Sequence, residues 1–177
     1  KKKKNAAANP SSPYGLQKRM SEMECKLYSE LYGLNTVSLR YFNVYSEDQP
    51  FSGAYSTVIS SWMHMIRTNR PLRIDGNGEQ TRDFIHVDDV VRCNISCIGS
   101  KNLLGNVLDV GTGKSVSLKF IKNKIDSCLP DRWNNSGSRI GDIKNSLADI
   151  ENTKRLLDWM PAIPIEEGLE RCFVLET

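Results

Sequence analysis

The clearest chemical pairing in the sequence is a tyrosine, Tyr14, followed four residues later by a lysine, Lys18. Residues four apart on a helix lie on one face, so the Lys18 ammonium can stand beside the Tyr14 phenol. A neighbouring positive charge favours the ionised form of a phenol, which needs that help because its ordinary pKa is about 10. The spacing alone can arise by chance. With support from neighbouring motifs, it predicts a tyrosine that acts as a general base on a hydroxyl group.

Three further stretches bring together aromatic, amide, guanidinium and carboxylate groups. They are LRYFNVY at residues 39–45, QTRDFIHVDDV at residues 80–90, and SRIGD followed by NSLADI at residues 138–142 and 145–150. The guanidinium of Arg82 can meet the oxygens of a diphosphate with two parallel hydrogen bonds. Arg82 is therefore a candidate for binding a phosphorylated ligand.

Together with SPYGLQK at residues 12–18, these stretches resemble the motifs of extended short-chain dehydrogenases/reductases that act on nucleotide sugars. The resemblance is strongest to the UDP-hexose and UDP-N-acetylhexosamine 4-epimerases and spans about residues 10–169. It implies NAD as the cofactor, a UDP-sugar as the substrate, and epimerisation at C4 through a transient 4-keto sugar. It also implies a homodimer whose interface includes the helix that carries Tyr14.

The resemblance assigns cofactor and proton-transfer roles to three residues. Tyr14 moves the proton of the sugar hydroxyl, and Lys18 also binds the nicotinamide ribose. Tyr41 lies at the nicotinamide end of the cofactor. The alternative for Tyr41 is an aromatic residue at the end of a strand.

The resemblance assigns the substrate to a second set of residues. Asn43, Arg82 and Arg139 are expected at the diphosphate, and Asp142 is expected to accept hydrogen bonds from the ribose hydroxyls. The alternatives are a turn-forming Asn43, a structural Arg82, and a loop arginine paired with a cap aspartate at positions 139 and 142.

Four positions bear on which sugar nucleotide is bound. Arg73 stands where relatives often have an aromatic residue that packs on uracil, and Ser146 stands near the C2 substituent of the sugar. A serine there leaves room for an N-acetyl group, unless Ser146 simply starts the helix entered at Ala148. Thr57 and Val58 belong to SGAYSTVI at residues 52–59, which is similar to a segment of UDP-N-acetylglucosamine epimerases.

Several polar residues are better explained by structure than by chemistry. We expect His86 to be a hydrogen-bonded residue at a strand-to-helix corner, and Asp83, Asp88 and Asp89 to be caps and corner ties. The sequence GKS at residues 113–115 is not the end of a P-loop, because Leu108 occupies the position where that motif requires glycine. The glycines at residues 111 and 113 are interpreted as turn formers.

The family's glycine-rich NAD fingerprint and the segment with its catalytic Ser or Thr do not occur in these 177 residues. The chain therefore resembles the back half of such an enzyme, and by itself it is not expected to retain NAD. Two alternatives remain for the function. One is a nucleotide-sugar decarboxylase or 4,6-dehydratase of the same family, and the other is an inactive fragment that only binds a nucleotide sugar.

The pattern of helices and strands predicts an α/β fold. Helices are expected at residues 14–31, 55–69, 88–98, 118–129, 148–157 and 165–173, strands at 35–44, 72–74, 84–87 and 106–110, and loops at 46–53 and 130–141. The predicted architecture is a partial Rossmann fold, consisting of the catalytic helix and strand, plus a small mixed α/β substrate-binding domain. Residues 1–9 are expected to be a disordered or artificially added tail, 10–45 the Rossmann remnant, and 46–177 the nucleotide-sugar-binding domain.

Composition excludes several other classes of protein. The formal charge is +3, and the four lysines at positions 1–4 exceed that charge by one, so no broad basic face for nucleic acid is expected. No apolar stretch approaches the roughly 20 residues that cross a bilayer, so we expect a cytoplasmic protein. Reduced structural thiols are expected at all five cysteines, which are Cys25, Cys93, Cys97, Cys128 and Cys172.

Overall fold

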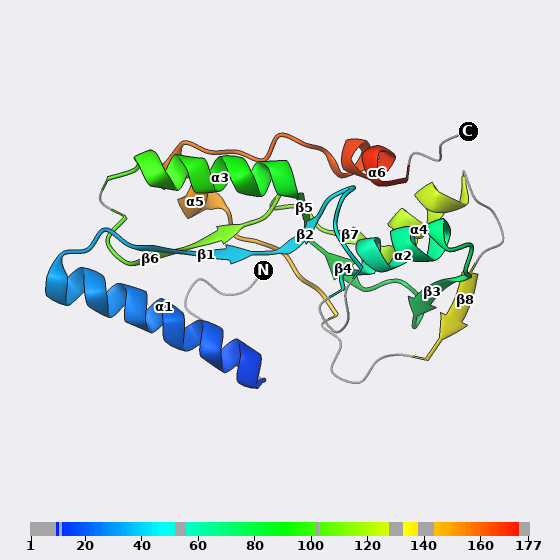
Figure 1. The fold of residues 1–177 in the computed structure, drawn as a ribbon, viewed down its shortest axis with the longest axis horizontal. Helices are drawn as coiled ribbons and strands as arrows, with labels where there is room; N and C mark the ends of the chain where they lie inside the picture. Colours follow the sequence, from blue (N-terminus) through cyan, green and yellow to red (C-terminus); the bar gives the residue numbers. More distant parts are fainter. Residues whose placement is uncertain are drawn as a thin grey trace.

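The computed structural model describes residues 10, 12–51, 56–101, 103–127, 133–137 and 144–173 (Figure 1). The elements follow the order α1 (Pro13–Tyr32), β1 (Val37–Tyr41), β2 (Asn43–Tyr45), α2 (Val58–Arg67), β3 (Leu72–Asp75), β4 (Thr81–Arg82), β5 (Phe84–His86), α3 (Val87–Gly99), β6 (Asn106–Val110), β7 (Val116–Ser117), α4 (Leu118–Asp126), β8 (Trp133–Ser136), α5 (Glu151–Leu157) and α6 (Ile165–Phe173).

The strands pair two by two, and three of the four pairs are parallel. β1 pairs with β6, β2 with β5 and β3 with β8 in parallel, whereas β4 and β7 are antiparallel. Figure 1 shows α1 on one side of the β1–β6 pair and α3 on the other. Parallel strands with helices on both faces are typical of α/β proteins, so the predicted fold class is confirmed.

Local signals set the two ends of α1. The hydroxyl of Ser12 accepts a hydrogen bond from the backbone N–H of Gly15 at 3.1 Å, and Pro13 occupies the first helical position. At the other end Gly33 has φ of +67°, the left-handed conformation that glycine adopts without strain. The helix therefore begins one residue before Tyr14, which lies in its first turn.

The expectation that residues 35–44 form one buried strand is wrong on two points. The stretch divides at Phe42, whose N–H donates to Val110 O at 2.9 Å, whereas the N–H of Asn43 donates to Asp83 O at 3.1 Å. The chain thus changes partner there, from β6 to β5. In addition, β1 is partly buried at first and exposed at its end, where Tyr41 is 48% exposed.

The apolar stripe of α1 is also exposed. Ser29 is the one buried residue among the described side chains of this helix, and its hydroxyl donates to Leu34 O at 2.6 Å. The apolar residues at helical spacing are half-exposed or more; they are Leu16, Met20, Met23, Leu27 and Leu31. The sequence pattern correctly predicts the helix, but among the described residues this stripe is not covered.

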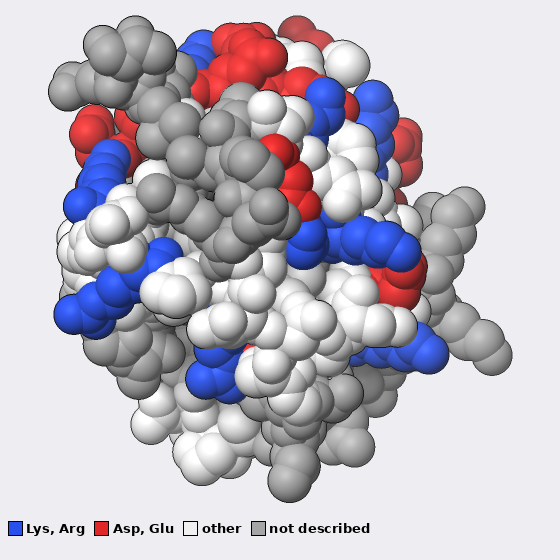
Figure 2. All heavy atoms as spheres, turned by 90° about the vertical axis from the view of Figure 1, so that its right-hand side faces the viewer, with Lys and Arg blue, Asp and Glu red and all other residues white. Residues whose placement is uncertain are grey.

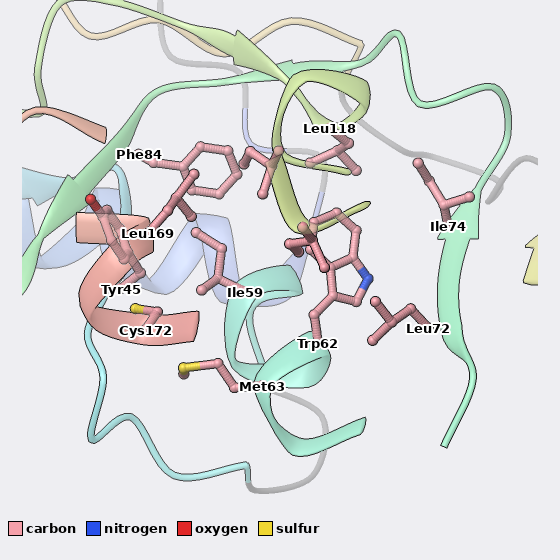
Figure 3. Packing of buried hydrophobic residues seen from close by; sticks show 12 residues of the cluster. Tyr45, Ile59, Trp62, Met63, Leu72, Ile74, Phe84, Leu118, Leu169 and Cys172 are labelled. Carbon is pink, nitrogen blue, oxygen red and sulfur yellow. The ribbon is translucent and has the colours of Figure 1, made fainter. Parts of the chain in front are cut away.

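The larger core lies between α2, β3, α4 and α6 (Figure 3). Trp62 of α2 is 1% exposed and packs edge to face against Trp133 of β8, with ring centroids 5.1 Å apart. Residues 130–141 were expected to be a loop, and this is wrong for residues 133–136, which form β8. The adjacent asparagines at 134 and 135 are typical of a turn. The strand forms by pairing with the distant β3, and no pattern in the local sequence indicates that pairing.

Several predicted helix boundaries also shift. α4 ends at Asp126 rather than near residue 129, and α5 begins at Glu151 rather than near residue 148. The expected cap of α3 was Asp88, but His86 is the N-cap, and its ring nitrogen accepts from the N–H of Asp88. By contrast, β6 and α6 have the predicted bounds.

The described cysteines are all free thiols; they are Cys25, Cys93, Cys97 and Cys172, whereas Cys128 lies outside the described residues. Burial raises the pKa of Cys93 and of Cys172 to about 12, so both thiols stay protonated at neutral pH. No described helix is long and apolar enough to cross a membrane. Figure 2 shows scattered charges of both signs on the face it displays, with acidic residues gathered near the top, rather than a continuous basic surface.

A carboxylate–guanidinium pair ties α1 to β1. Arg40 of β1 donates to both carboxylate oxygens of Glu22, from Nε at 2.6 Å and from Nη2 at 2.7 Å. Arg19 adds a third hydrogen bond at 2.9 Å. These hydrogen bonds, with that from Arg40 the largest effect, lower the pKa of the Glu22 carboxyl, whose side chain is only 12% exposed. The pair holds the helix that carries Tyr14 against the sheet.

We predict that Arg40→Gln lowers the free energy of unfolding by about 1 kcal/mol at pH 7. Because the folded-state pKa of Glu22 is lowered, this contribution is present above the unfolded carboxyl pKa of about 4.3 and is lost as the pH falls through the lower folded value. Urea titrations of both proteins at pH 7 and pH 3 measure the difference. Lys26→Gln, which breaks only the exposed pair with Glu30, is the control. An equal difference at both pH values would contradict the role of Glu22.

Candidate active site

Tyr14 and Lys18 lie on the same face of α1, as their spacing predicts. The Lys18 Nζ atom is 5.3 Å from the centroid of the Tyr14 ring. Both side chains are exposed, and Tyr14 is 57% accessible. The pair therefore presents a phenol and an ammonium together at the protein surface, where a bound ligand can reach both.

Tyr41 and Asn43 lie on either side of the point where β1 gives way to β2. The Tyr41 hydroxyl donates to Asn94 Oδ1 of α3 at 2.9 Å. The side-chain amide of Asn43 donates to Asp83 O at 2.8 Å, beside the backbone hydrogen bond to the same oxygen. These contacts fix both side chains. An amide nitrogen carries two hydrogens, and the contacts with the described residues use one of them, so the other can donate to a ligand.

The structure places Ser146 beside the strand that contains Arg82. The N–H of Ser146 donates to Thr81 O at 3.0 Å, and the side chains of Thr81 and Asn145 are hydrogen-bonded at 3.0 Å. Arg82 follows Thr81 directly on β4, and its guanidinium donates to Thr81 O at 2.9 Å. Two candidate substrate residues that are distant in sequence are therefore neighbours in the fold.

A buried carboxylate, Asp83, connects the segments that carry these residues. Its side chain accepts hydrogen bonds from the Thr112 N–H at 2.8 Å, the Thr112 hydroxyl at 2.7 Å, the Gly113 N–H at 2.9 Å and the Ala148 N–H at 3.1 Å. Asp83 itself is fully buried. We call Asp83, Thr112, Gly113 and Ala148 the Asp83 cluster. The sequence indicates a corner tie at Asp83, but carries no signal for which segments it joins.

The turn at residues 111–113 requires glycine for two different reasons. A Cβ on Gly111 would lie 2.5 Å from the Ala148 Cβ and 3.0 Å from an Asp83 oxygen, so only glycine permits this close approach. Gly113 instead has φ of +71°. The N–H groups of residues 112 and 113 both donate to the carboxylate of Asp83, so neither is left to bind a phosphate group. The turn is therefore no phosphate cradle.

Thr57, Val58 and Arg73 have structural contacts of their own. The Thr57 hydroxyl caps α2 by accepting from the Ser60 N–H at 3.3 Å, and Val58 packs against the larger core. The Arg73 Nε atom lies 2.8 Å from Asp75 Oδ1 and 3.0 Å from Ser136 Oγ, which ties β3 to β8. Their roles toward a substrate stay predictions.

His86 is 1% exposed and hydrogen-bonded on both ring nitrogens, to Glu47 Oε2 at 3.0 Å and to the Asp88 N–H at 3.3 Å. These contacts are those of a corner residue. Asp89 is likewise fully buried and accepts from the N–H groups of Ala162 and Ile163 at 3.1 Å. Two other candidate substrate residues, Arg139 and Asp142, lie outside the described residues.

Comparisons with known proteins place this arrangement in a family. A family model described as "NAD dependent epimerase/dehydratase family" matches residues 1–111, which is more than half of the chain. The chain belongs to this family. The expected resemblance is therefore confirmed, and the family is NAD-dependent.

Three solved structures of epimerases are similar to the chain. A UDP-N-acetylglucosamine 4-epimerase from Methanobrevibacter ruminantium M1, in complex with UDP-N-acetylmuramic acid, is 35% identical with a TM-score of 0.87 over 96% of this chain and 55% of that one. A UDP-glucose 4-epimerase from Thermotoga maritima, with UDP-glucose, is 30% identical with a TM-score of 0.86, covering 93% and 53%. A UDP-glucuronic acid 4-epimerase from Bacillus cereus, in complex with UDP-glucuronic acid and NAD, is 30% identical with a TM-score of 0.84, covering 96% and 54%.

The chain spans about half the length of the curated relatives it matches. These three epimerases bind different sugar nucleotides, so membership of the epimerase/dehydratase family does not by itself specify a substrate. The described residues fit one end of a dinucleotide. Tyr14 and Lys18 present a phenol and an ammonium that suit ribose hydroxyls, whereas the glycine turn at 111–113 is filled by Asp83 and cannot receive the pyrophosphate.

We predict that Asp83→Asn lowers the free energy of unfolding by about 2–4 kcal/mol, because an amide offers one acceptor oxygen where the carboxylate offers two. The new NH₂ group would face one of the N–H donors of the Asp83 cluster. Urea unfolding followed by circular dichroism measures the change. The matched control is Asp88→Asn, at an exposed carboxylate that pairs with Arg171 at 3.2 Å, where we expect a loss below about 0.5 kcal/mol. Equal losses in the two variants would show that the cluster is not a structural centre.

Proposed function

We propose that this chain provides the proton-transfer and substrate-holding part of an NAD-dependent nucleotide-sugar 4-epimerase. Its substrate is a UDP-hexose or a UDP-N-acetylhexosamine. The observation that carries the proposal is the exposed Tyr14–Lys18 pair in the first two turns of α1, with Lys18 Nζ 5.3 Å from the phenol ring. Such a pair serves as a general base with an adjacent positive charge.

In this proposal Tyr14 removes the proton from the C4 hydroxyl of the sugar. The ammonium of Lys18 stabilises the negative charge on the phenol oxygen and binds the nicotinamide ribose. Tyr41, fixed by Asn94, lies at the nicotinamide end. NAD, when bound, takes a hydride from C4 and returns it to the other face of the ring. Tyr14 then returns its proton to the C4 oxygen.

The substrate-holding residues act on the nucleotide rather than on the sugar. Asn43, Arg82 and Arg139 bind the diphosphate, and Asp142 binds the ribose. Because the nucleotide is held firmly, the 4-keto sugar can turn over within the site before hydride returns. The Asp83 cluster supports this arrangement, because it joins the residue next to Arg82 to the segment that follows Ser146.

We further propose that residues 10–45 form the end of the NAD-binding domain and residues 46–177 the nucleotide-sugar-binding domain. A homodimer is supported by the apolar stripe of α1. Its residues Leu16, Met20, Met23, Leu27 and Leu31 are 50–63% exposed, and a helix face of this kind is typical of an interface.

The first test is Tyr14→Phe, measured in a protein that also carries an NAD-binding portion ahead of Pro10. We expect kcat for UDP-hexose epimerisation to fall by at least about 100-fold, because the proton acceptor is lost while the ring remains. KM should change by no more than about three-fold. Tyr28→Phe, at an exposed tyrosine on the same helix, is the matched control. An unchanged kcat for Tyr14→Phe would remove Tyr14 from the mechanism and with it the proposed function.

The choice of sugar is proposed to depend on Ser146, which lies beside β4 next to Arg82. A serine is small, and the site therefore has room for the N-acetyl group at C2. A large aromatic side chain in the same place would overlap that group, and overpacking of a close-packed site is costly. We therefore infer that UDP-N-acetylglucosamine or its galacto epimer is accepted, besides UDP-glucose and UDP-galactose.

The second test is Ser146→Tyr in the same protein, with Ser146→Ala as the control. We expect kcat/KM for the N-acetylated substrates to fall by at least about 50-fold, while kcat/KM for UDP-glucose stays within about three-fold. Ser146→Ala should leave the ratio of the two activities unchanged, because it adds no volume. A loss of both activities in equal proportion would refute Ser146 as the selective residue.

A further inference from the structure

A cavity lies between the turn after β6, the N-terminal end of α5 and the segment that leads into α6. Its volume is about 390 Å³, within the range of small-molecule sites. Its lining is more apolar than polar, and its large apolar side chains are Phe84, Val116, Ile150, Met160, Ile163 and Ile165. None of the candidate catalytic or substrate residues in the described part of the chain lines it, so a ligand bound there would be distinct from the proposed substrate.

Three charged residues also line the cavity: Lys114, Lys154 and Glu166. Lys154 pairs with Glu151 at 3.1 Å, but the Glu151 side chain is 73% exposed, so this ion pair is weak and easily exchanged. Lys114 belongs to a hydrogen-bonded turn, since its N–H donates to the Thr112 hydroxyl at 3.2 Å. Two lysines are thus part of the lining of a mostly apolar cavity.

We propose that this cavity binds a small organic monoanion, namely a carboxylate attached to an aromatic or branched apolar group. The apolar body would be buried against the six wall residues, with a gain of about 25 cal/mol for each Å² removed from water. The carboxylate would pair with Lys114 and Lys154. Glu166 adds a negative charge to the lining, which disfavours ligands with two or more negative charges.

The cavity shares residues with the Asp83 cluster. Thr112 lines the cavity and also donates both its N–H and its hydroxyl to Asp83. Phe84, another wall residue, directly follows Asp83 in the chain. The lining is therefore held in place by a buried network, and the site is formed before any ligand enters.

The test is a titration of the ¹⁵N-labelled chain with 3-phenylpropionate, followed by amide chemical shifts. We expect a Kd below about 1 mM, with the largest shifts at Thr112, Gly113, Ile163 and Ile165. The neutral analogue 3-phenylpropanamide should bind at least about five-fold more weakly, because it lacks the charge that pairs with lysine.

Three variants distinguish a specific site from general adhesion of an apolar anion. Lys114→Gln should raise the Kd at least about five-fold, and Glu166→Gln should lower it, because each changes one charge of the lining. Lys101→Gln, at an exposed lysine elsewhere, should leave the Kd unchanged. Shifts confined to the exposed stripe of α1, equal binding of the neutral analogue, or an unchanged Kd in Lys114→Gln would each overturn the proposal.

Discussion

The buried carboxylate of Asp83 is the interaction on which the arrangement of the candidate site depends. A carboxylate shielded from water is costly unless hydrogen-bond donors surround it, and here four donors come from Thr112, Gly113 and Ala148. The first two residues follow β6, and the third lies between Ser146 and α5. The hydrogen bonds to the Asp83 carboxylate therefore bring together three parts of the chain that are distant in sequence: Asp83 itself, the turn at 112–113, and Ala148.

Three candidate substrate residues depend on this point. Arg82 precedes Asp83 directly, and Ser146 is hydrogen-bonded to the strand that contains Arg82. Asn43 is attached through the carbonyl oxygen of Asp83. A rigid frame of this kind suits the binding of a nucleotide, because residues that are already in place lose little entropy when a ligand arrives.

Tyr14 and Lys18 are held by a different and more exposed set of contacts. The ion pair between Glu22 and Arg40 fastens α1 to β1, while the apolar stripe of the helix remains accessible among the described residues. The Asp83 cluster and the helix that carries the candidate base Tyr14 thus have separate supports. The apolar cavity adjoins the Asp83 cluster, since Thr112 and Phe84, the residue after Asp83, take part in its lining.

The sequence by itself determined features that depend on neighbours along the chain. The helix α1 with its end at Gly33, the bounds of β6 and α6, and the shared face of Tyr14 and Lys18 follow from residue spacing and from local signals at helix ends. Only the tertiary structure decided the rest. The break at Phe42, strand β8, the position of Ser146 beside β4 and the exposure of the α1 stripe all depend on which distant segments meet. Periodicity records whether a residue is apolar, but pairing and burial depend on partners that no local pattern identifies.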